Sequence, residues 1–217
     1  MGLVISLCDY TGNMVRPWLE AGHDCIIVDI KHPEGKSCEG FNFAKPKQGR
    51  LVKIGSRVED LRNSISPSRL RFAIGFAFPP CTHVAVSGAK HFQHKGLEAL
   101  IEALTTLKDC LRIIEHCRAW CLENPVSTFS TYWRKPDFIF DPYQYASASD
   151  NFAEEMYTKR TCLWTGGDFV MPPARDMFID NPHKIHYLGK AGQEERSITP
   201  LGFAYAVYEA NKHLLNV

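Results

Sequence analysis

Short apolar segments that end in turns or acidic residues alternate with helical patterns along this chain of 217 residues. Residues 4–7 and 25–30 have the pattern of buried strands, and a turn at 11–13 and a short helix over 14–22 separate them. Residues 70–78 predict a third strand. Strands that alternate with helices form a mainly parallel sheet with helices on both faces. The alternation therefore predicts one three-layer α/β domain that spans the whole chain.

The other segments complete this pattern. The spacing of apolar residues over 96–122 predicts the longest helix, and the polar composition of 31–53 indicates an excursion on the surface. No repeat or long linker divides the chain. We further expect a helix over 58–65, a strand over 161–164, loops over 168–197 and a C-terminal amphipathic helix over 199–215.

The composition fits a globular protein in a reducing compartment. Lys and Arg number 25 against 24 Asp and Glu, so net charge favours no polyanionic partner, and no apolar run reaches the roughly 20 residues of a membrane span. The first residues, MGLVISLCDY, read as a strand rather than a signal peptide. Eight cysteines without a CxxC pair indicate free thiols and a cytoplasmic location. Cys110, Cys117 and Cys121 share one face of the predicted helix with Ile114, which favours a buried stripe over a metal site with His116.

Polar groups that follow the first two strands indicate a cofactor site. Thr11, Gly12 and Asn13 form a turn after the first strand, where backbone amides can meet a ligand. Asp29 lies 17 residues beyond Gly12, at the tip of the second strand. A carboxylate there can accept hydrogen bonds from ribose hydroxyls. This arrangement predicts a cofactor that contains a nucleoside.

The third strand runs into the sequence Pro79-Pro80-Cys81. Proline fixes its own φ and restricts the residue before it, so the thiol has a fixed approach at the strand end. This pattern is typical of a nucleophile, and the alternative is a small buried hydrophobic residue. Glu123, in ENPVS, follows an apolar segment where burial would raise its pKa and let it polarise a heterocyclic ring. The alternative is a glutamate at a helix end that faces solvent.

The combination of PPC, ENP some forty residues later and the start TGN…VDI resembles the DNA cytosine-5 methyltransferase family. The likeness follows the family's order through nearly the whole chain and is greatest to compact phage-encoded members. KRT at 159–161 matches the family's basic strand, and RSIT at 196–199 matches the segment before the last helix. The resemblance implies a Rossmann-like S-adenosylmethionine-dependent methyltransferase fold, with S-adenosyl-L-methionine as the cofactor.

The resemblance also implies the reaction, which is methyl transfer to C5 of cytosine in DNA. The thiolate would add to C6, the glutamate would stabilise the ring at N3, and in a duplex the base must leave the stack. The implied catalytic residues are Cys81, Glu123, Asn124 and Arg160, of which Arg160 would hold the base or an adjacent phosphate. The implied cofactor contacts are Asp9, Tyr10, Thr11, Gly12, Asn13, Met14, Asp29, Ile30, Asp60 and Pro79. The implied substrate contacts are Pro80, Thr82, His83, Ser87, Lys90 and Lys159.

Several positions depart from the family's pattern. Tyr10 stands where a glycine is usual, Pro125 replaces the usual valine, and Ser87 is offset from the serine that normally follows the cysteine loop. The long target-recognition region is reduced to residues 166–195. Its cationic and histidine side chains suit phosphate contacts; they include Arg175, His183, Lys184 and His186. The chain would therefore recognise a short DNA site, rely on a separate recognition protein or act on a smaller substrate.

Lysines and histidines follow Cys81, namely His83, Lys90, His91, His94 and Lys95. They either grip the phosphate of the flipped nucleotide or form a solvated loop, and a zinc site from three of the histidines is disfavoured. Two further functions stay open: the same chemistry on a free pyrimidine nucleotide or RNA, and a non-catalytic relative that binds the cofactor or DNA.

Overall fold

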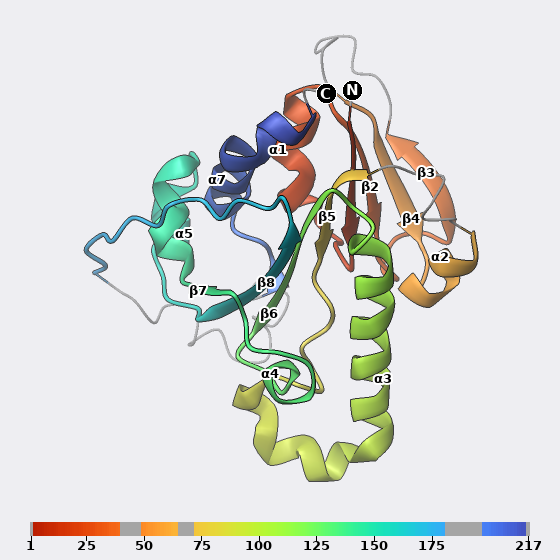
Figure 1. Ribbon diagram of the computed structural model, residues 1–217. Coiled ribbons are helices and arrows are strands. Elements are labelled where there is room, and N and C mark those ends of the chain that lie inside the picture. The colour runs from red at the N-terminus through yellow and green to blue at the C-terminus, as the bar shows by residue number, and fades with distance from the viewer. Residues whose placement is uncertain (1, 40–48, 65–71, 181–196, 216–217) are drawn as a thin grey trace.

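An eight-stranded mixed sheet forms the centre of the protein. The computed structural model describes residues 2–39, 49–64, 72–180 and 197–215. The strand order in the sheet is β3-β4-β2-β1-β5-β6-β8-β7 (Figure 1). The strands are β1 (Leu3–Leu7), β2 (Asp24–Val28), β3 (Gly35–Glu39), β4 (Leu51–Gly55), β5 (Phe72–Ala77), β6 (Ala119–Pro125), β7 (Phe138–Phe140) and β8 (Thr161–Gly167).

Five neighbouring strands, β4, β2, β1, β5 and β6, are parallel, whereas β3, β8 and β7 each pair with a neighbour in the antiparallel sense. Leu7 at the end of β1 is in register with Val28 of β2 and with Ala77 of β5, and Ala77 is in register with Leu122 of β6. The loops that follow these strands therefore leave the same edge of the sheet. The predicted α/β class with a mainly parallel sheet is confirmed.

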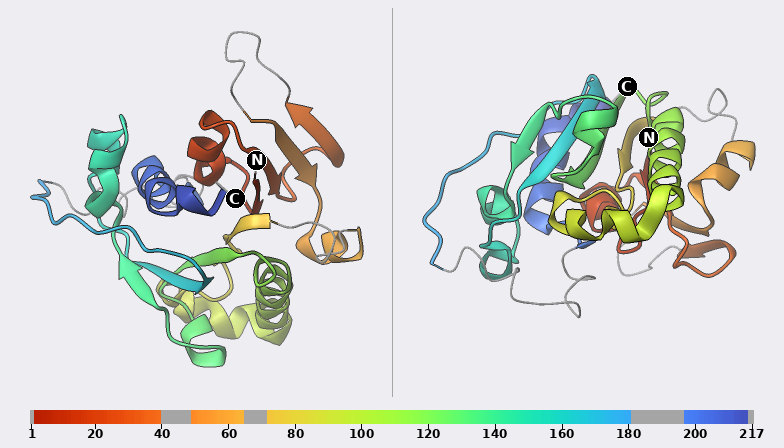
Figure 2. Two further views of the ribbon diagram at one scale, coloured as in Figure 1. Left: turned by 45° about the horizontal axis from the view of Figure 1, so that its top comes forward. Right: turned by 90° about the horizontal axis from the view of Figure 1, so that it is seen from below.

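Helices cover both faces of the sheet (Figures 1 and 2). Leu61 and Leu107, from α2 and α3, belong to the apolar core on one face. Trp18 and Val207, from α1 and α7, belong to the core on the other face. The α-helices are α1 (Arg16–Glu20), α2 (Val58–Ser64), α3 (Phe92–Ile114), α4 (Phe129–Tyr132), α5 (Phe152–Glu155) and α7 (Leu201–Asn211). The 3₁₀ turns are η1 (Asn13–Val15), η2 (Val86–His91), η3 (Pro142–Ala148) and η5 (Lys212–Leu215).

A bend near its start divides α3. Gly96 has φ 74° and ψ −177°, a conformation that glycine adopts without the steric cost of a side chain. The segment before Gly96 continues from η2 and lies at the lower end of the molecule in Figure 1, and the longer part of α3 runs along the sheet. In the view from below in Figure 2, η2 and the start of α3 face the reader. The bend thus sets this segment at the edge where β5 ends.

Two sequence predictions are wrong. Residues 31–53 contain the strands β3 and β4, and β4 extends the parallel sheet; residues 40–48 lie outside the described ranges. The predicted helix over 96–122 ends at Ile114, and β6 begins at Ala119 after a short turn. Trp120 belongs to one core and Cys121 to the other, so β6 is buried on both faces and shows no alternation of apolar and polar residues.

The cysteine stripe needs a related correction. Cys110, Cys117 and Cys121 are all buried, but Cys121 lies on β6 and packs in the core on the opposite face from Cys110. Within the described ranges, no three Cys, His, Asp or Glu side chains come close enough to hold a metal ion. None of the helices in the same ranges combines the length and the apolar character that crossing a membrane requires.

Candidate active site

The candidate site lies where the strand order reverses. In an open α/β sheet, ligands bind beyond the carboxyl ends of the strands, at the point where successive strands turn from one direction of the sheet to the other. Here that point is between β1 and β5. Backbone hydrogen bonds fix the exits: Asp9 N donates to Val28 O (3.1 Å), and Phe78 N donates to Leu7 O (2.9 Å). The predicted cofactor loop and the predicted cysteine loop therefore leave the sheet next to each other.

Asp9 organises the first loop. Its carboxylate is buried and accepts hydrogen bonds from Ser6 Oγ (2.8 Å), Gly12 N (2.8 Å) and Thr11 Oγ1 (3.4 Å). Burial raises the pKa of Asp9, although these hydrogen bonds act in the opposite direction. Gly12 has φ 71°, which favours glycine. Asp9 therefore shapes the turn that was predicted to meet the cofactor.

One predicted cofactor contact is a core residue instead. The Met14 side chain is fully buried and packs with Trp18 and Ile27, so a ligand cannot reach it. The sequence alone did not reveal this because Met14 lies in the 3₁₀ turn η1, whose inward face depends on how η1 and α1 pack on the sheet. Asp60 is exposed on α2, which follows β4, two strands away from β1 in the sheet.

Three other predicted contacts lie at the exits of β1 and β2. Asp29 follows β2 directly, and one of its carboxylate oxygens accepts a hydrogen bond from Lys31 N (2.8 Å). Ile30 and Tyr10 are large and exposed, at 70% and 54%. The Tyr10 ring lies 5.2 Å from the ring of His32. A carboxylate beside exposed apolar and aromatic side chains has the chemistry to hold a ribose and a flat base.

The C-terminal segment reaches the same loop. Asn13 Nδ2 donates a hydrogen bond to Thr199 O (3.0 Å), and Thr199 precedes α7. Tyr205 OH donates to Glu20 Oε2 (2.6 Å), which joins α7 to α1. The segment before the last helix therefore lies beside the first loop; Arg196 lies outside the described residues.

The cysteine loop is tied directly to the Glu-Asn pair. Asn124, which is only 1% exposed, donates a hydrogen bond from Nδ2 to Pro79 O (2.8 Å). Cys81, two residues further on, is half-buried. Two residues span at most about 7 Å, so the Cα atom of Cys81 lies within about 7 Å of the Cα atom of Pro79. Pro79 is buried and Pro80 exposed, so Pro79 acts as the anchor of this loop.

The chain beyond the cysteine stays bound to the chain beyond Asn124. Cys81 O accepts hydrogen bonds from Val84 N (3.0 Å) and Ala85 N (2.8 Å), which closes a turn. Val86 N donates to Val126 O (2.9 Å), and Thr128 N donates to Val84 O (3.0 Å). Two motifs that lie more than forty residues apart in the sequence thus form one hydrogen-bonded unit.

Glu123 lies on β6, with its side chain 17% exposed. Burial raises its pKa, and the ammonium group of Lys159, 3.9 Å from Oε1, opposes that rise. Glu123 is therefore not the solvent-facing helix end that sequence reasoning left open. The ion pair with Glu123 comes from Lys159, whereas Arg160 is exposed at the start of β8. Arg160 as a catalytic residue stays a prediction.

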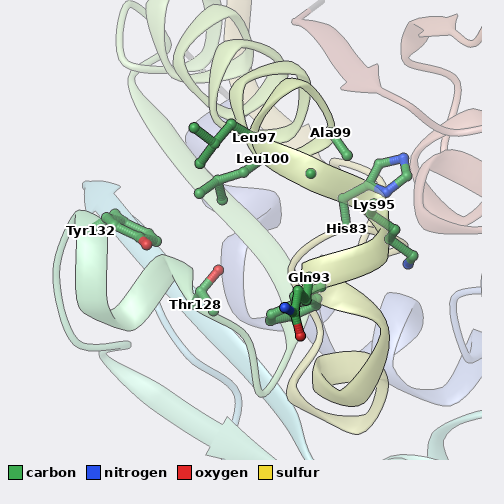
Figure 3. A pocket seen from close by; sticks show the side chains of 10 residues that line it. His83, Gln93, Lys95, Leu97, Ala99, Leu100, Thr128 and Tyr132 are labelled. Carbon is green, nitrogen blue, oxygen red and sulfur yellow. The ribbon is translucent and has the colours of Figure 1, made fainter.

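Apart from Lys159, the predicted substrate contacts lie on the cysteine loop and on η2. Thr82, Ser87 and Lys90 are exposed, and His83 is half-buried. Lys95 Nζ donates a hydrogen bond to Thr82 O, which draws the start of α3 onto the cysteine loop. Beside this loop lies a pocket of about 320 Å³ (Figure 3). Sequence reasoning missed this pocket, because its far wall comes from α4 and no motif marks that helix.

The reduced recognition region has no helix or strand over its described part after β8, residues 168–180. Its remaining predicted phosphate contacts, His183, Lys184 and His186, lie outside the described residues. Compared with models of known protein families and with curated proteins, the chain matches none. The fold and the site define an α/β protein whose sheet carries the Cys81 thiol, the largely buried carboxyl group of Glu123, and the Gly12 turn with Asp29 near its switch point.

Proposed function

We propose that this protein is an S-adenosylmethionine-dependent methyltransferase that modifies C5 of cytosine in DNA. The observation that carries the proposal is the hydrogen bond from Asn124 to Pro79, which joins the Pro-Pro-Cys loop to the strand that bears Glu123. Without β3, the parallel strands follow the order third, second, first, fourth, fifth, which is the order of doubly wound nucleotide-binding sheets. This order supports a Rossmann-like methyltransferase fold.

The residues at the exits of β1 and β2 suit the cofactor. Thr11 is exposed in the turn at the switch point, Asp29 offers a carboxylate to the ribose, and Ile30 and Tyr10 offer surfaces for the adenine ring. When bound, S-adenosylmethionine supplies the electrophilic methyl group. Asn13 links this loop to Thr199, so the C-terminal segment supports the predicted cofactor loop.

The cysteine supplies the step that makes the pyrimidine reactive. C5 of cytosine is a weak nucleophile, and addition of the Cys81 thiolate to C6 turns the ring into an enamine whose C5 can accept a methyl group. Loss of the C5 proton to a base or to water then expels the thiolate and restores the aromatic ring. A thiol anchored through Pro79 meets C6 in one orientation, which lowers the entropic cost of the addition.

Glu123 suits the other side of the ring. A carboxyl group whose pKa is raised holds its proton to higher pH than a free glutamate, so it can donate a hydrogen bond to N3 while the thiolate adds at C6. Its second oxygen can accept from the exocyclic amine. Lys159 keeps a positive charge beside the carboxyl group and provides a contact for a substrate phosphate or carbonyl.

Mass spectrometry of nucleosides tests this proposal. DNA incubated with the protein and S-adenosylmethionine should gain 5-methylcytosine; parallel incubations with RNA and with deoxycytidine monophosphate identify the substrate. Cys81→Ser should abolish the product, and Glu123→Gln should lower the rate by roughly a hundredfold. Glu154→Gln, an exposed glutamate on α5, is the matched control and should retain full activity. Equal product from wild type and Cys81→Ser would refute the assignment.

A further inference from the structure

The pocket beside the cysteine loop lies between two segments, one that follows β5 and one that follows β6. One wall is formed by His83 and the start of α3, and the opposite wall by Thr128 and Tyr132, which follow the Glu-Asn pair. Figure 3 shows Leu97 and Leu100 on one side of the space, and Thr128 and Tyr132 on the other. Its volume of about 320 Å³ is at the lower end of the range for small-molecule sites. The pocket thus has room for one flat ring system rather than for an extended ligand.

Two polar atoms of the residues that line the pocket are buried and have no hydrogen-bond partner in the described structure. They are Oγ1 of Thr128 and Nδ1 of His83. Most buried polar atoms in proteins are paired, because an unpaired one loses its hydration without compensation. In Figure 3 the Thr128 hydroxyl points into the space towards Leu100. Both of these unpaired groups belong to residues that line the pocket.

The rest of the lining is apolar and aromatic. Phe92 and Tyr132 supply rings, and Leu97 is 75% exposed although it is one of the apolar residues at helical spacing on α3. An amide and an ammonium group, from Gln93 and Lys95, lie at the rim. Apolar walls with a few hydrogen-bonding groups suit a nucleobase, which has two flat faces and polar edges.

The segments around the pocket carry mainly positive charge, although the exposed Glu98 lies between the lining residues Leu97 and Ala99. No Asp or Glu occurs over residues 79–97 or over 124–136. The first segment contains Lys90 and Lys95, and the second contains Lys135 and Arg134, of which Arg134 pairs with Asp137. A ligand with negative charge is therefore favoured at the rim, as expected for a nucleotide whose phosphate remains outside the pocket.

We propose that this pocket binds an unstacked nucleobase that neighbours the cytosine at Cys81. The proposal rests on the proposed function for the identity of the strand. His83 follows Cys81 by two residues, so their Cα atoms lie at most about 7 Å apart, and a base held at His83 belongs to a nucleotide next to the target. Direct contact with a flanking base would let the protein recognise its DNA site although the recognition region is reduced to residues 166–195.

A crosslinking experiment tests the pocket without cofactor, so methyl transfer does not enter the result. The probe is a pool of short single-stranded oligodeoxynucleotides of random sequence in which 5-iodouracil replaces thymine. Irradiation should link the probe to the peptides that contain Phe92 or Tyr132, as mapped by mass spectrometry. Thr128→Val, which removes only the hydroxyl group, should weaken binding of the pool about fivefold by fluorescence anisotropy. Ala99→Phe, which fills the pocket, should weaken it at least about tenfold and remove these crosslinks.

Thr131→Val is the matched control, because Thr131 is exposed on the same helix and does not line the pocket; it should bind like the wild type. Wild-type affinity in both Thr128→Val and Ala99→Phe, with crosslinks elsewhere, would overturn the inference. If no 5-methylcytosine forms but crosslinks at Phe92 or Tyr132 persist, the proposed function fails and the base pocket stands. If 5-methylcytosine forms without such crosslinks, the base pocket alone is refuted.

Discussion

Removal of the Asn124 side chain gives the sharpest test of how the site is held together. In Asn124→Ala, Pro79 O loses its buried hydrogen bond, and a buried carbonyl without a partner costs about 1–3 kcal/mol. Oδ1 of Asn124 is itself buried without a partner in the described structure, and its removal returns part of that cost. We therefore expect the free energy of unfolding to fall by about 2 kcal/mol, which corresponds to a decrease in Tm of about 4–8 °C for a chain of this size.

Activity should respond more strongly than stability suggests. The lost hydrogen bond fixes the loop that carries Cys81, and each 1.4 kcal/mol of lost transition-state stabilisation lowers kcat/KM about tenfold. We expect methyl transfer to fall by about tenfold to a hundredfold at a temperature where the variant is fully folded. Urea unfolding followed by circular dichroism measures the stability, and incorporation of labelled methyl groups measures the rate.

Ser127→Ala is the matched control. Ser127 is buried three residues further along, and its Oγ has no hydrogen-bond partner in the described structure, so its loss should change the free energy of unfolding by less than about 0.5 kcal/mol. The reasoning is refuted if Asn124→Ala unfolds like Ser127→Ala and transfers methyl groups at the wild-type rate.

Three other predictions follow from the same structure. Burial raises the pKa of Glu123, so the folded protein binds this proton more tightly than the unfolded chain, and the free energy of unfolding falls as pH rises from 4.5 through the raised pKa. The stability of Glu123→Gln relative to wild type should therefore increase over that pH range in urea titrations. A constant difference between the two proteins would contradict this prediction. Asp29→Ala should weaken S-adenosylmethionine binding by about tenfold or more in calorimetry, and an unchanged Kd would remove Asp29 from the site. Gly202→Ala should lower the free energy of unfolding by about 1–3 kcal/mol in urea titrations, because a Cβ there would lie 2.3 Å from Tyr145 O. Wild-type stability would show that α7 and the backbone at Tyr145 can move apart without cost.

Local patterns predicted much of the fold. The strands β1, β2, β5 and β8 and the helices α1, α2 and α7 follow from runs of apolar residues and from turn signals, which act over a few neighbours. The patterns failed where both faces of a strand are buried, as in β6, because such a strand and a buried helix share one apolar signature. β4 was missed because Lys53 and the polar residues around it suggested a surface segment, whereas pairing with β2 places it in the sheet.

By itself the sequence determined which chemical groups follow which strands: Asp29 after the second, the rigid Pro79-Pro80-Cys81 exit, and Glu123-Asn124 further along. Only the tertiary structure decided which of them meet. Asn124 bonds Pro79, Lys159 rather than Arg160 pairs with Glu123, Met14 turns into the core, and Thr128 closes a pocket against α3. The reason is physical: the type of a residue and its strand are local properties, whereas partners across a sheet depend on strand order and register, which form only when the whole core packs.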